Sequence, residues 1–236
     1  MRNGIFGAVL ASLLVPLPAT ASELPAGFVR LRDVDPEIRQ DIRYAGSANF
    51  LKRPAKGYDA PVCILTRKAA EALSRVQKSL DPGFTLVVFD CYRPDRAVKD
   101  FANWVGQSKQ KDPLWHPNVR RRDLIRQGYI ASRSGHSRGS TVDLAIVPLD
   151  PAGKTANPSC GAQDTGSLDF ATGFDCIDPK SRTAYSPLPK EAAANRRLLV
   201  EAMKAEGFRN YSKEWWHFTL NEEPFPKRYF DFPVTD

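Results

Sequence analysis

Apolar residues recur at helical spacing in one stretch of the chain, and two further stretches have helix boundary signals. Within 66–80 the apolar positions fall on one face of a helix, at Ala69, Leu73, Val76 and Leu80. A second helix is expected over 94–105, because a proline suits its first turn. A third is expected over 189–206, with Gly207 ending it.

Short β-branched and apolar runs predict the strands of a sheet. The run T-L-V-V-F at 85–89 is typical of a buried strand, and 141–147 has the same character. Two more short strands around a turn are expected within 208–220. The stretch 149–188 is rich in proline, glycine, serine and aspartate, which predicts a long ordered loop. These elements indicate one α+β domain, in which helices pack on one side of a small, mostly antiparallel sheet.

The first 21 residues have the pattern of a secretory signal peptide. Arg2 supplies a positive charge, 5–15 form a short apolar core, and Ala19-Thr20-Ala21 is the small-x-small pattern that signal peptidase recognises. The core is shorter than the roughly 20 apolar residues that span a bilayer, and an uncleaved interfacial anchor is the alternative. We therefore expect a mature domain over 22–236 that is periplasmic or secreted and has no stable membrane association.

Composition indicates a globular protein and argues against a nucleic-acid partner. Hydrophobic residues make up 42% and aromatic residues 10% of the chain, as in ordinary folded cores. The formal charge of +7 becomes +6 when Arg2 is removed, because 1–21 contains no acidic residue. The basic residues are scattered apart from Arg120-Arg121-Arg122, and an exported protein rarely meets nucleic acid. We interpret the charge as a solvated face, with attraction to anionic envelope polymers as the alternative.

Four cysteines in an exported chain predict two disulfides. They allow three pairings and include no C-x-x-C pair, which argues against a zinc–thiolate site. We favour Cys160–Cys176, which would close the long loop, with Cys63–Cys91 as the second bridge. Spacing alone leaves the other pairings open.

Two of the three histidines lie within seven residues of a carboxylate and beside strand-like segments. Two imidazoles and one carboxylate suffice to bind zinc and leave the fourth tetrahedral position for water, as a catalytic zinc requires. We therefore expect His136, Asp143 and His217 to bind one zinc ion. A hydrogen-bonded structural His–Asp pair is the alternative. His116 is instead predicted to be a surface loop residue.

Two further residues have the chemistry that a hydrolase needs beside a metal. Glu214 lies three positions before His217 and is the candidate general base. Positions three apart on a straight strand face opposite sides, so we predict an irregular segment at 213–217 that lets the two side chains converge. Arg93, just past the first strand, is the candidate to hold a developing oxyanion. A surface glutamate and a capping arginine are the corresponding alternatives.

The combined motifs resemble those of the D-alanyl-D-alanine dipeptidases. S-x-H-x-x-G-x-x-x-D over 134–143 is followed by E-x-W-H over 214–217. That family consists of zinc metallopeptidases that share a fold with the Hedgehog signalling domain. The similarity covers essentially the whole mature chain and includes D-I-R-Y at 41–44, D-C-Y-R-P at 90–94 and Y-F-D-F-P at 229–233.

The resemblance implies zinc-dependent hydrolysis of the small substrate D-Ala-D-Ala. It gives the zinc ligands, the base and the arginine the same roles as above. It adds Ser134 and Asp175 as residues that hold the substrate, with the Asp175 carboxylate facing the free ammonium group. It also places Tyr44 in the pocket.

Two features distinguish this chain from the cytoplasmic resistance-type dipeptidases. The segment between Asp143 and Asp175 is longer, and the signal peptide predicts export, so we expect turnover or scavenging of D-Ala-D-Ala released from peptidoglycan. One alternative is a zinc D,D-carboxypeptidase on peptidoglycan stem peptides, which an open cleft would mark. Another is a non-catalytic zinc module that binds peptidoglycan, which would have no need of the Glu214 base.

Overall fold

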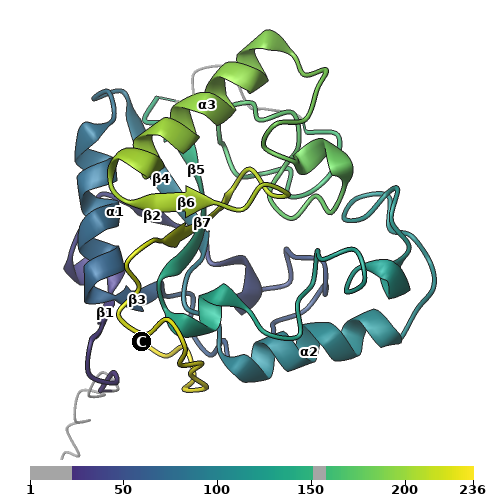
Figure 1. Ribbon diagram of the computed structural model, residues 1–236, viewed down its shortest axis with the longest axis horizontal. Helices are drawn as coiled ribbons and strands as arrows, with labels where there is room; N and C mark the ends of the chain where they lie inside the picture. The colour runs from purple at the N-terminus through teal and green to yellow at the C-terminus, as the bar shows by residue number, and fades with distance from the viewer. Residues whose placement is uncertain (1–22, 151–157) are drawn as a thin grey trace, which may run out of the picture.

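The computed structural model describes residues 23–150 and 158–236, so the predicted signal peptide lies outside the described residues. At the centre of this part of the chain is a five-stranded sheet with the order β2-β4-β5-β7-β6 (Figure 1). Its neighbours pair antiparallel, except for the parallel pair of β2 and β4. The strands are β2 (Arg39–Gln40), β4 (Phe84–Asp90), β5 (Thr141–Pro148), β6 (Phe208–Asn210) and β7 (His217–Leu220). The expected α+β fold with a mostly antiparallel sheet is confirmed.

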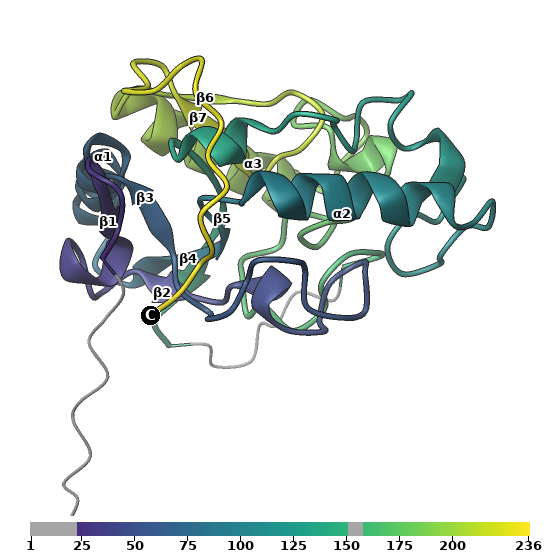
Figure 2. The same cartoon turned by 90° about the horizontal axis from the view of Figure 1, so that it is seen from below.

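The three predicted helices are present with nearly the predicted bounds, as α1 (Arg67–Ser79), α2 (Asp95–Gly106) and α3 (Lys190–Ala205). Thr66 caps α1, because its side chain accepts a hydrogen bond from the Ala69 amide. α1 and α3 contact each other, and α3 also contacts β6. α2 lies apart from both, at the lower right of Figure 1, and crosses the front of Figure 2.

Three short strands, β1 (Phe28–Arg30), β2 and β3 (Ile64–Thr66), were not predicted from the sequence. β1 and β3 form a separate antiparallel pair, and β2 has only two residues. Such short elements carry too few residues for a periodic pattern to develop.

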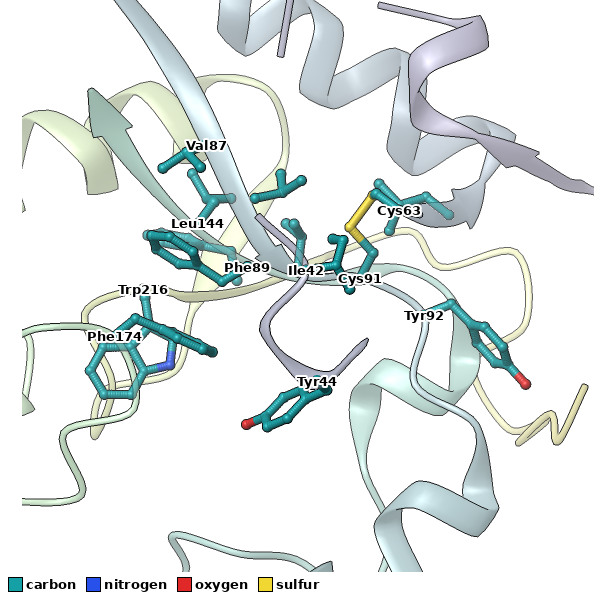
Figure 3. Packing of buried hydrophobic residues seen from close by; sticks show 14 of the residues in the cluster. Ile42, Tyr44, Cys63, Val87, Phe89, Cys91, Tyr92, Leu144, Phe174 and Trp216 are labelled. Carbon is teal, nitrogen blue, oxygen red and sulfur yellow. A yellow bond between two sulfur atoms is a disulfide. The ribbon is translucent and has the colours of Figure 1, made fainter. Parts of the chain in front are cut away.

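The central strands are covered on both faces. Every residue of β5 from Thr141 to Val147 is buried, whereas a strand with one solvated face would alternate. The segment 158–188 provides part of this cover, since Phe174 stacks on Phe89 of β4 with ring centroids 4.8 Å apart (Figure 3). As expected, this segment is mostly irregular; its described residues contain one short 3-10 helix, Pro179–Ser181.

Both predicted disulfides, Cys63–Cys91 and Cys160–Cys176, are present. The prediction for His116 was wrong. Its side chain is buried, its Nδ1 lies 2.9 Å from the Val119 carbonyl oxygen, and its ring packs edge-on against Trp104. Trp104 of α2 thus covers the loop around His116, which was expected to be exposed to solvent. Across 23–150 and 158–236, no helix is both long and apolar enough to cross a membrane.

Candidate metal centre and active site

Three neighbouring strands align a row of polar side chains at one end of the sheet. Asp143 of β5 lies opposite Asp90 of β4 on one side and opposite His217 of β7 on the other. Directly opposite residues point to the same face of a sheet, so the register brings these side chains together. A register shift between Val88 and Asp90 is essential to this row, because unbroken pairing would place Phe89 opposite Asp143.

A short turn before β5 brings His136 to the same place. His136 lies in the 3-10 helix Gly135–Arg138, and its amide donates to the Ser134 side chain at 3.3 Å. Gly139 then reverses the chain with φ +78°, and a Cβ there would lie 2.2 Å from the Phe28 ring. This turn is the irregularity that lets His136 and Asp143 face one another despite their spacing.

The donor atoms of His136, Asp143 and His217 lie within 4.8 Å of one another. His136 Nε2 is 3.3 Å from Asp143 Oδ2 and 3.3 Å from His217 Nδ1. The buried Asp143 Oδ1 accepts no hydrogen bond, although His217 Nδ1 lies 3.0 Å away. A buried carboxylate oxygen without a donor is costly, and a cation would satisfy it.

The environment of His136 also fits a bound cation. Its Nδ1 lies 2.7 Å from the Cys91 carbonyl oxygen and must donate to it, since a carbonyl only accepts. The lone pair of Nε2 therefore faces Asp143 and His217. Burial alone would raise the pKa of Asp143, but the two imidazoles lower it below its usual range. Two nitrogen donors and one carboxylate suit a divalent metal such as zinc.

Glu214 reaches the group because the chain turns between β6 and β7. The residues before His217 are irregular, as predicted, and Glu214 Oε2 lies 3.5 Å from His217 Nδ1. The Tyr211 carbonyl accepts from the Glu214 amide at 2.9 Å and fixes this turn. Burial raises the pKa of Glu214 to about 7, against the opposing charge of His217. A carboxylate of this kind can exchange protons near neutral pH.

Arg93 is held beside the candidate metal ligands by Asp90. Its Nη2 lies 2.7 Å from Asp90 Oδ2 and 3.6 Å from Asp143 Oδ2. Its guanidinium carbon also lies 5.1 Å from the Tyr44 ring centroid and 4.9 Å from that of Phe101. Burial would lower the pKa of Arg93, but Asp90 raises it well above its usual value, so the guanidinium stays charged.

Asp175 lies across the pocket on the irregular segment. Its Oδ2 accepts a hydrogen bond from the Tyr44 hydroxyl at 2.7 Å. Burial raises the pKa of Asp175 well above its usual value, against that hydrogen bond. Its backbone has φ +59°, a conformation that non-glycine residues adopt rarely and that is common at functional sites.

One cavity of about 260 Å³ unites every residue predicted for the site. It is lined by Tyr44, Arg93, Ser134, His136, Asp143, Asp175, Glu214 and His217. The volume lies below the roughly 300–1,000 Å³ of drug-sized ligand pockets, so it suits a small substrate.

The chain's similarity to known proteins agrees with this geometry. A model of a peptidase family described as D-Ala-D-Ala dipeptidase matches residues 25–235. The chain belongs to the D-Ala-D-Ala dipeptidase family. It is therefore a metallopeptidase.

Curated relatives in this dipeptidase family match along most of their length. The D-alanyl-D-alanine dipeptidase of Enterococcus faecium is 37% identical over 88% of this chain and 98% of its own. The D-alanyl-D-alanine dipeptidase of Streptomyces coelicolor is 41% identical over 84% and 93%. The protein of the same name from Escherichia coli is 28% identical over 81% and 83%.

Asp90, for which no role was predicted from the sequence, lies at the centre of this candidate site. Asp90 is fully buried and accepts hydrogen bonds from Arg93 and from the Tyr58 hydroxyl. The available signal was its position at the end of a buried strand, three residues before Arg93. Tyr129, Arg133 and Tyr211 also line the cavity, and no role was predicted for them from the sequence.

Proposed function

We propose that this protein is a zinc-dependent dipeptidase that hydrolyses D-Ala-D-Ala to two D-alanines. The observation that carries the proposal is the small cavity in which the His136–Asp143–His217 donor set, the Glu214 carboxyl and the Asp175 carboxyl face one another. The names of the curated relatives support the choice of substrate.

His136, Asp143 and His217 would hold the zinc ion. When bound, zinc lowers the pKa of a coordinated water to about 7 and polarises a carbonyl oxygen. The Cys91 carbonyl fixes the His136 ring for this role through the 2.7 Å hydrogen bond.

Glu214 is the general base and then the general acid. It takes a proton from the water that attacks the scissile carbonyl carbon. As the carbon–nitrogen bond breaks, it returns that proton to the leaving amine. A pKa of about 7 suits a group that must accept and release a proton in one cycle.

Arg93 stabilises the negative charge that develops on the carbonyl oxygen. Asp90 and the Tyr44 and Phe101 rings hold its guanidinium before substrate arrives, which is the preorganisation that this kind of stabilisation requires. Among the described basic residues that line the cavity, Arg93 alone lies within 4.0 Å of the Asp143 carboxylate.

Asp175 binds the free ammonium group of the dipeptide, with Tyr44 orienting the carboxylate and Ser134 contacting the substrate. An ammonium supplies the positive partner that the buried Asp175 lacks in its present contacts. The requirement for a free N-terminus follows, and it separates a dipeptidase from a carboxypeptidase that accepts blocked stem peptides.

The protein acts outside the cytoplasm in this proposal, on D-Ala-D-Ala released from peptidoglycan. The support is the signal-peptide pattern over 1–21. Recovery of the mature chain from the cytosolic fraction of the native cell would contradict this location.

The test compares amino-acid release from D-Ala-D-Ala, N-acetyl-D-Ala-D-Ala and L-Ala-L-Ala by the zinc-loaded mature protein. We expect cleavage of the free D,D form alone. Glu214→Gln should lower kcat roughly 10²–10⁴-fold, the usual contribution of general acid–base catalysis. The matched control Glu222→Gln alters an exposed glutamate that pairs with Lys68 and should leave kcat unchanged.

Two other outcomes would indicate a different function. Cleavage of the acetylated substrate would indicate a carboxypeptidase and remove the ammonium role from Asp175. Stoichiometric zinc binding without cleavage of any substrate would indicate a non-catalytic module.

A further inference from the structure

The Cys63–Cys91 disulfide lies immediately beside the metal ligands. Cys91 directly follows Asp90, the last residue of β4, and Cys63 directly precedes β3. Both cysteines are buried. Figure 3 shows the disulfide at the end of β4, on the side away from the packed rings of Phe89, Phe174 and Trp216. The bond thus joins the catalytic end of the sheet to the separate β1–β3 pair.

The backbone of Cys91 makes the shortest contact with His136 Nδ1, at 2.7 Å, whereas Asp90 Oδ2 lies 3.5 Å from the same nitrogen. The Cys91 carbonyl oxygen accepts from Nδ1, and Nε2 then lies 3.3 Å from Asp143 Oδ2. Rotation of the Cys91 peptide would remove the shorter of these two Nδ1 contacts and loosen the orientation of the ring.

The sheet does not extend far enough to hold that peptide. The pairing of β4 with β5 ends at Asp90 opposite Asp143, one residue before Cys91. Beyond this point, the Tyr92 amide donates to the Ile64 carbonyl at 2.8 Å, and the disulfide fastens Cys91 to Cys63. The hydrogen bond and the disulfide therefore both join this part of the chain to the segment at Cys63 and Ile64.

We propose that Cys91 is a positioning residue for the metal and that its disulfide to Cys63 raises metal affinity by fixing the carbonyl that orients His136. The inference rests on the metal site of the proposed function. It concerns residues that do not themselves touch the metal or the substrate.

The second disulfide provides a matched comparison within the same chain. Cys176 follows Asp175, so Cys160–Cys176 fastens the substrate side of the pocket. Loss of either bond removes one covalent link from a buried region. Only the loss of Cys63–Cys91 should disturb the orientation of His136.

The experiment measures the zinc dissociation constant of the wild-type protein, of C63S/C91S and of C160S/C176S by competition with a chromophoric chelator, after circular dichroism confirms folding. We expect C63S/C91S to bind zinc about 10–100-fold more weakly, the usual effect of losing a partner that orients a ligand. C160S/C176S should stay within about twofold of the wild type, because the carbonyls of Cys160 and Cys176 accept from Gly173, Asp178 and Ser181 and not from a histidine of the metal site.

Equal zinc affinity of the wild type and C63S/C91S would overturn the inference, as would equal weakening in both double variants. Failure of the wild type to bind zinc would instead count against the proposed function.

A measurement on the metal-free wild type needs no variant and keeps the inference testable if C63S/C91S does not fold. Nitrogen-15 NMR at mildly alkaline pH should show His136 protonated at Nδ1, with a slowly exchanging proton, and unprotonated at Nε2. A ring protonated at Nε2, or an Nδ1 proton that exchanges as fast as that of an exposed histidine, would overturn the role of the Cys91 carbonyl.

Discussion

The two halves of the pocket are built in different ways. On the metal side, Asp143 and His217 lie directly opposite each other on paired strands, and strand register sets their positions. On the substrate side, Asp175 lies in an irregular segment and Tyr44 in the 3-10 helix Arg43–Ala45. A sheet ladder fixes side chains collectively, whereas an irregular segment depends on individual anchors.

The anchors of the substrate side can be identified one by one. The two irregular segments joined by Cys160–Cys176 approach each other closely, because a Cβ on Gly173 would lie 2.2 Å from the Ala162 carbonyl oxygen. The buried Arg196 of α3 donates to the Phe170 carbonyl, and the Trp215 indole donates to the Thr172 hydroxyl at 2.9 Å. The comparison predicts that changes on the metal side abolish catalysis, whereas changes on the substrate side mainly raise KM.

The largest effect is expected from His217→Ala. It leaves two donors for the metal, and a catalytic metal contributes several kcal/mol of transition-state stabilisation, so kcat/KM should fall by roughly 10³-fold or more. Metal content after dialysis and kcat/KM would be measured together. His116→Ala is the matched histidine control; it should lower thermal stability but retain metal, because His116 is buried away from the cavity. Full metal occupancy in His217→Ala would contradict the ligand assignment.

A smaller and different effect is expected from Asp175→Asn. The change keeps the shape but removes the charge that faces the substrate ammonium, and hydrogen bonds to charged groups contribute about 1.5–3 kcal/mol. KM for D-Ala-D-Ala should rise about 10–100-fold with metal content unchanged. Steady-state kinetics beside metal analysis checks both. A loss of metal, or a fall confined to kcat, would show that the two halves are not separable.

The smallest effect is expected from Gly173→Ala. Its new methyl group would push against the Ala162 backbone and displace the segment that carries Asp175, at a cost of about 1–3 kcal/mol in the free energy of unfolding. Urea denaturation measures that cost, and KM should rise several-fold. Gly46→Ala is the control, because its added Cβ would meet no atom within 4 Å apart from its own residue and its chain neighbours, and it should change stability by less than about 0.5 kcal/mol. Equal effects of the two changes would contradict the close approach at Gly173.

The difference between the metal side and the substrate side of the pocket also explains what could be predicted from the sequence. The apolar pattern of 66–80 and the β-branched run at 85–89 gave correct elements, because burial on helices and strands leaves a periodic trace. The spacing of Glu214 and His217 even predicted the irregular turn before β7. Reasoning from residue types therefore selected the residues that the fold brings together on the metal side of the pocket.

The substrate side was not accessible in this way. Asp175 entered only through a family resemblance, since an aspartate in a loop rich in polar residues has no periodicity to mark it. Asp90 was missed because its role depends on a register shift in β4 and on contacts with Tyr58 and Arg93. His116 was misplaced because the cover over its loop comes from Trp104 of α2, an element distant from its own segment.

The central claim is that hydrolysis depends on one metal ion held by His136, Asp143 and His217. The most direct test removes metal with a chelator, returns zinc in small steps and follows D-alanine release from D-Ala-D-Ala. We predict that the metal-free protein is inactive and that activity rises in proportion to added zinc until one ion per chain is bound. Full activity in the metal-free protein, or activity that ignores added zinc, would contradict the account.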